Sequence, residues 1–154
     1  MTELADKVDE LKKIQEGDAW HGPALREVLA GVTAEQALAK PIPDAHSIWE
    51  LVLHIMAWGN VFTRRLQGQP LEEPPEGDFP PIGERTHKAW NETVKRLERG
   101  HAEFVSTVAG LSESRLTEKA PGRPYTLRFL INSTVRHHVY HTGQIALLKK
   151  SFTG

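Results

Sequence analysis

Apolar residues recur every three or four positions along most of the chain, which places them on one face of an α-helix. Four long segments show this spacing, at about residues 4–14, 47–66, 90–111 and 126–148, and a shorter one covers about 23–32. The alternation of apolar and polar residues that is typical of β-strands does not rise above this helical pattern. The sequence therefore predicts an all-α protein.

Proline, glycine and capping residues mark where these helices begin and end. Ser47 precedes Glu50 by three residues and resembles a capping box at the start of a helix. Residues 67–83 hold five of the ten prolines and three glycines, which predicts a long surface connection. A second long break covers residues 112–125. Four long helices with long connections in a chain of this size predict a four-helix bundle.

The composition fits one soluble globular domain, and we expect that domain to span residues 1–154. The chain is 39% hydrophobic and 25% charged, with no long uncharged apolar run, so a membrane span is excluded. A net charge of -1 argues against a nucleic-acid-binding protein, and no compact helix-turn-helix with a basic second helix is present. Acidic residues interrupt the first fourteen positions, which argues against a signal peptide, so we expect a cytoplasmic protein.

With no cysteine in the chain, the eight histidines are the main candidates for chemistry. His137 and His141 are four residues apart in the last predicted helix, so their rings lie one above the other on one helix face. Two imidazoles at this spacing can reach one metal ion, and a third ligand should come from another helix. His54, in the middle of the helix that begins near Ser47, is the best candidate.

Helical geometry predicts which of these histidines face the core. At roughly 100° per residue, His138 points about 20° from the centre of the apolar face of the last helix. His141 lies about 40° and His137 about 80° to one side of that centre, and His54 lies about 100° from the centre of its own stripe. Edge positions on two helices can meet beside the core, in a cleft that water reaches, as a catalytic metal requires.

Each histidine also has a purely structural interpretation. A lone histidine beside an apolar stripe, such as His54, is usually a partly buried, hydrogen-bonded residue. His138 is expected to pack inward, although it could replace His137 as a ligand. His101 lies on a core stripe, where a satisfied core histidine or a pocket lining is expected. Solvated positions near helix starts or breaks are expected for His21, His46 and His87. Core positions are expected for Trp20, Trp49, Trp58 and Trp90, although one or two of these could wall a pocket.

Two stretches of the sequence resemble a known family. From Ser47 to Ile55 the chain reads Ser-Ile-Trp-Glu-Leu-Val-Leu-His-Ile, and from Tyr140 to Ile145 it reads Tyr-His-Thr-Gly-Gln-Ile. Together they are similar to the DinB-like (DNA-damage-inducible, YfiT-like) superfamily, which is distinct from the DNA polymerase of similar name. The resemblance covers nearly the whole chain, including the order of the helices.

The resemblance implies a four-helix bundle that binds a divalent metal ion, zinc or nickel in different members, through three histidines. Carried onto this sequence, the ligands are His54, His137 and His141. Members are similar to metal-dependent enzymes that use low-molecular-weight thiols, such as bacillithiol or mycothiol transferases and isomerases, or are described as hydrolases. The resemblance also implies a small-molecule substrate and a homodimer.

A site with three neutral imidazoles leaves the metal charge uncompensated and at least one coordination position open. Water in that position has its pKa lowered from 15.7 towards about 7, and a thiol binds there as the nucleophilic thiolate. The ligands alone therefore do not separate a hydrolase from a thiol S-transferase. Glu50 and Gln144, each about one turn from a ligand, could orient an imidazole or remain solvated. The competing hypothesis is a metal-binding stress-response or dimerisation protein without catalysis.

Overall fold

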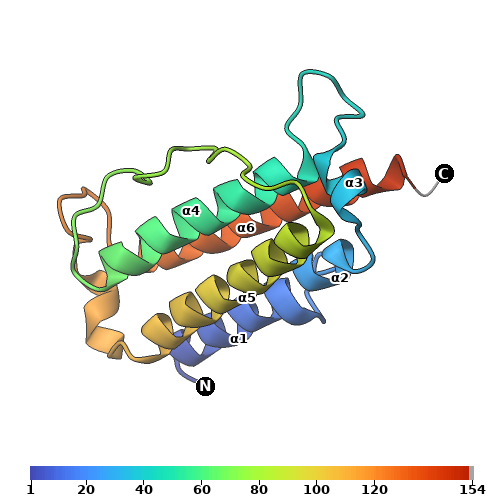
Figure 1. Ribbon diagram of the computed structural model, residues 1–154. Helices are drawn as coiled ribbons and strands as arrows, with labels where there is room; N and C mark the ends of the chain where they lie inside the picture. Colours follow the sequence, from blue (N-terminus) through green and yellow to red (C-terminus); the bar gives the residue numbers. More distant parts are fainter. Residues whose placement is uncertain (153–154) are drawn as a thin grey trace.

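The computed structural model describes residues 1–152 of the chain and contains four long helices, two short helices and one 3₁₀ helix (Figure 1). The elements are α1 (Glu3–Glu16), α2 (Leu25–Leu29), α3 (Ala34–Leu38), α4 (Ile48–Leu66), α5 (His87–Ala109), η1 (Glu113–Thr117) and α6 (Leu127–Lys150). Within residues 1–152, extended pairing is limited to two isolated bridges, Ala19 with Gly22 and Lys119 with Thr126. The predicted all-α fold is confirmed.

The four long helices pack as a bundle in which α4 contacts α5 and α6, and α1 contacts the same two helices. Figure 1 shows α4 and α6 lying side by side, with α5 and α1 as the second pair. The short helix α2 packs on α1 and α6, and α3 packs on α4 and α5. The long connection after α4 runs back along that helix before α5 begins.

Each long helix begins at a hydroxyl side chain that accepts a hydrogen bond from the backbone N–H three residues later. The four capping residues are Thr2, Ser47, Thr86 and Thr126. Such a bond satisfies one of the backbone donors that have no partner inside the helix. The reciprocal half of the capping box expected at Ser47 does not form, because the Glu50 carboxylate binds other partners, described below.

The region of residues 23–32 differs from the single helical segment that the sequence predicts. Helix α2 ends at Leu29, because Gly31 adopts φ 77, a left-handed conformation that glycine favours. Thr33 then caps α3 through the backbone N–H of Gln36. The prediction of four core tryptophans was also wrong in part. Trp49 and Trp90 are buried, Trp58 is half-buried, and Trp20 is fully exposed.

The apolar core is divided into two clusters at opposite ends of the bundle. One cluster joins α2 and α3 to the first half of α4 and the last turns of α6, and the other joins α1, η1 and the first half of α6. Along α6, the buried residues between Val135 of one cluster and Ile145 of the other are His138, His141 and Thr142. Burying polar side chains costs free energy unless they find partners. The middle of the bundle is therefore where a functional site is expected.

Candidate metal centre

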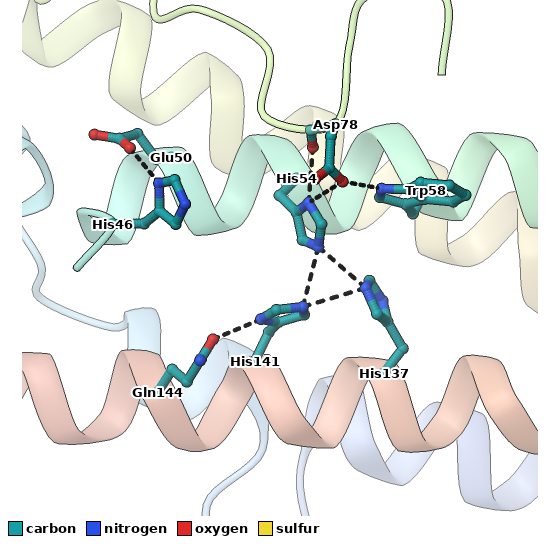
Figure 2. Close-up of polar contacts among 8 residues, drawn as sticks. All are labelled: His46, Glu50, His54, Trp58, Asp78, His137, His141 and Gln144. Atoms are coloured by element: carbon teal, nitrogen blue, oxygen red, sulfur yellow. Dashed lines mark hydrogen bonds and ion pairs between the residues drawn. The ribbon is translucent and has the colours of Figure 1, made fainter. Parts of the chain in front are cut away.

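The imidazoles of His54, His137 and His141 converge between α4 and α6 (Figure 2). The Nε2 atom of His54 lies 3.1 Å from that of His137 and 3.0 Å from that of His141. The Nε2 atoms of His137 and His141 are 3.2 Å apart. Two helices thus bring together the three histidines that were predicted as ligands. We call these three residues the histidine triad.

The outward nitrogens of two triad members are held by hydrogen-bond acceptors. His54 Nδ1 lies 2.7 Å from the backbone carbonyl of Asp78, and His141 Nδ1 lies 2.6 Å from the Gln144 side-chain oxygen. Because each of these acceptors requires a proton on Nδ1, the Nε2 atoms of His54 and His141 carry lone pairs. This arrangement fixes the tautomer and the ring orientation in metal-binding histidines.

The donor set fits a divalent metal ion. The Nε2 lone pairs of His54 and His141 face each other at 3.0 Å, where neither nitrogen can donate to the other. A cation bound by these lone pairs would remove that repulsion. Uncharged imidazoles suit zinc, nickel and other transition metals better than magnesium or calcium, which prefer oxygen ligands.

Burial keeps two members of the triad, His137 and His141, in the neutral state that metal binding requires. His54 and His141 are buried and His137 is partly buried. Loss of solvation, followed by the neighbouring imidazoles of His141 and His54, lowers the pKa of His137 to about 4. Loss of solvation also lowers the pKa of His141. His137 and His141 are therefore neutral near pH 7 without a bound cation.

The proline-rich connection supplies contacts that the sequence did not predict. Besides the Asp78 carbonyl, the Asp78 carboxylate lies 3.3 Å from His54 Nδ1 and accepts a hydrogen bond from Trp58 Nε1 at 2.7 Å. The Phe79 ring stacks on His54 at 4.2 Å and on His46 at 3.6 Å between ring centroids. This loop therefore covers one face of the His54 ring and holds its Nδ1 atom.

The two residues considered as supports for the ligands have different contacts (Figure 2). Gln144 accepts the hydrogen bond from His141. The Glu50 carboxylate lies 2.6 Å from His46 Nδ1 and 3.1 Å from Lys40 Nζ. Glu50 therefore joins the start of α4 to the preceding loop and orients His46.

His101 and His138 form a second pair of histidines inside the bundle, with ring centroids 5.0 Å apart. His101 Nε2 donates to the backbone carbonyl of Leu11 at 2.7 Å, and His138 forms a hydrogen bond with the backbone of Ile14. Loss of solvation lowers the pKa of His138 to about 3. We call these residues the core pair. His138 packs inward as the helical geometry predicts, while the adjacent His137 points toward His54 and His141.

Comparison with known proteins identifies the family of this chain. A match to the DinB superfamily covers residues 19–145, which include all of the triad and the core pair. The chain belongs to the DinB superfamily. No curated protein and no solved structure matches it.

The DinB superfamily match and the geometry together support the site. The three histidines that the resemblance implied as ligands are the group that residues 1–152 bring close enough to hold a metal ion. In the same part of the chain, no helix has the length and apolar character needed to span a membrane.

Proposed function

We propose that this DinB superfamily protein is a metal-dependent enzyme that acts on a small substrate, as a low-molecular-weight-thiol S-transferase or as a hydrolase. The observation that carries the proposal is the convergence of three imidazole nitrogens with no carboxylate among them. Such a donor set binds a divalent ion without neutralising its charge, and a catalytic metal site needs that charge and an open position.

His54, His137 and His141 would hold the divalent ion, which would supply a Lewis acid for a water molecule or a thiol. The protein contributes a rigid set of ligands. Asp78 and Gln144 hold His54 and His141 in one tautomer, and Phe79 stacks on the His54 ring. The His137 ring also lines a groove between α4 and α5, which gives a small molecule a way to approach the triad.

Activity measurements with a ligand variant test the proposal. Zinc- or nickel-loaded protein is incubated with activated esters, amides and alkylating electrophiles, with and without a low-molecular-weight thiol. We expect turnover that is lost in His141→Ala and retained in the control His21→Ala, whose side chain is exposed. Thiol-dependent turnover supports the transferase, and thiol-independent turnover supports the hydrolase. Metal binding without turnover of any substrate would favour the non-catalytic hypothesis.

A further inference from the structure

A groove of about 970 Å³ between α4 and α5 extends into the middle of the bundle. Its lining includes His137 of the triad and both members of the core pair, His101 and His138. Phe62, Leu97 and Phe104 are among the apolar residues of the same lining. The groove therefore connects the bundle surface, the edge of the metal centre and the polar layer between the two apolar clusters.

One atom in this lining lacks a partner. The Nε2 atom of His138 is buried and makes no hydrogen bond, and the side chain is 4% exposed. The other ring nitrogen, Nδ1, forms the hydrogen bond with the Ile14 backbone. The proton is therefore on Nδ1, and Nε2 carries a lone pair. A buried polar atom without a partner is rare in folded proteins, and a ligand is one of the explanations.

Neighbouring polar groups in the groove are also acceptors. His101 Nε2 donates to the Leu11 carbonyl, so its Nδ1 atom carries a lone pair. The Thr93 and Thr134 hydroxyls donate to carbonyls of their own helices, Ala89 and Leu130 respectively. Each of these side chains donates its hydrogen bond to a backbone carbonyl and has only acceptor lone pairs left. A molecule that enters the groove must therefore supply a hydrogen-bond donor to satisfy them.

We propose that this groove binds a small, mostly apolar molecule that carries one hydroxyl or N–H group, and that this group donates a hydrogen bond to His138 Nε2. The aromatic and aliphatic walls contact the apolar part of the molecule. Binding requires the groove and not the metal. That the bound molecule is the substrate of the metal centre rests on the proposed function, because His137 belongs to both sites.

Phenol and toluene are a matched pair of probes, since they differ in the hydroxyl group. Their association constants are measured by calorimetry on chelator-treated protein, for wild type and for His138→Leu, which lacks the acceptor. We expect the ratio of the phenol constant to the toluene constant to fall about tenfold in the variant, because one hydrogen bond is lost. His21→Leu is the control and should leave the ratio unchanged.

A second variant keeps the test decisive if His138→Leu does not fold. His138→Asn retains a side-chain donor for the Ile14 backbone but has no atom in place of Nε2, so the ratio should fall in this variant too. The proposal is overturned if the ratio stays at the wild-type value in the folded variants, or if wild type binds neither probe. Zinc titration of the same proteins reports on the triad separately, so failure of this proposal and failure of the proposed function are distinguishable.

Discussion

The histidine triad and the core pair are built from the same residue type, yet they occupy different environments. His137 and His138 are adjacent in the sequence, but consecutive residues on a helix point about 100° apart. His137 therefore reaches the edge between α4 and α6, where it meets two other imidazoles. His138 points into the bundle, where it meets His101 and the backbone of α1.

The difference shows that position on the helix, more than the local motif, determines the role of each histidine. The triad brings three ring nitrogens together, and the Nε2 lone pairs of His54 and His141 repel each other without a cation. The two imidazoles of the core pair form hydrogen bonds with the backbone of α1. These bonds tie α5 and α6 to that helix. The first arrangement supports metal binding. The second ties the helices together and leaves a ring lone pair of His138 facing the groove.

The largest expected effect is on metal affinity. His137→Ala leaves two imidazoles, so zinc affinity should fall by orders of magnitude. His138→Ala removes a side chain that does not belong to the triad, so its zinc affinity should stay within a few-fold of wild type. Competition with a chromogenic chelator measures both constants. Equal losses in the two variants would contradict the separation of triad and core pair.

In the metal-free protein, His138→Ala should lower the free energy of unfolding more than His137→Ala does. His138→Ala opens a cavity and frees a backbone partner in the core, which should lower the free energy of unfolding by about 2–4 kcal/mol. His137 is only partly buried, so His137→Ala should cost less than about 1 kcal/mol. Urea unfolding with a chelator present gives both values. A larger loss for His137→Ala would show that the assigned roles are reversed.

Acid should destabilise the metal-free protein, and part of the loss should come from His138 of the core pair. The pKa of His138 is about 3 in the folded protein and about 6.5 in the unfolded chain. Between these two pKa values the unfolded chain binds more protons than the folded protein does. The contribution of neutral His138 to the free energy of unfolding is therefore complete above pH 6.5 and is lost as the pH falls. The loss should reach about 3 kcal/mol near pH 4. In His138→Phe the slope of stability against pH should become shallower, and an unchanged slope would refute this assignment.

A smaller effect is expected from the residue that orients a ligand. Gln144→Leu removes the acceptor for His141 Nδ1, which should weaken zinc binding about tenfold. Glu50→Gln is the matched control on α4, because its carboxylate contacts His46 and Lys40. Zinc affinity should therefore change less than about twofold in the control. A tenfold loss in Glu50→Gln would indicate that the polar contacts of His46 support the site.

The sequence predicted the helical parts of this protein better than the loops. Apolar spacing and Ser or Thr caps determine where α4 and α6 lie and which way their histidines point, because helical geometry is regular. Asp78 and Phe79 lie in a proline-rich connection whose path has no repeating pattern, so nothing in the sequence indicated that they contact His54. The exposure of Trp20 was missed for the same reason, since it lies in a tight loop after Gly17, outside any helix.

The central claim is that three particular histidines bind the metal, and imidazole NMR spectra test it most directly. Long-range ¹H–¹⁵N spectra report each ring nitrogen of the eight histidines before and after zinc is added. We predict that at one zinc ion per chain the Nε2 signals of His54, His137 and His141 shift together, while those of His101 and His138 stay near their metal-free positions. Zinc-induced shifts centred on the core pair, or binding that leaves the triad unchanged, would contradict the account.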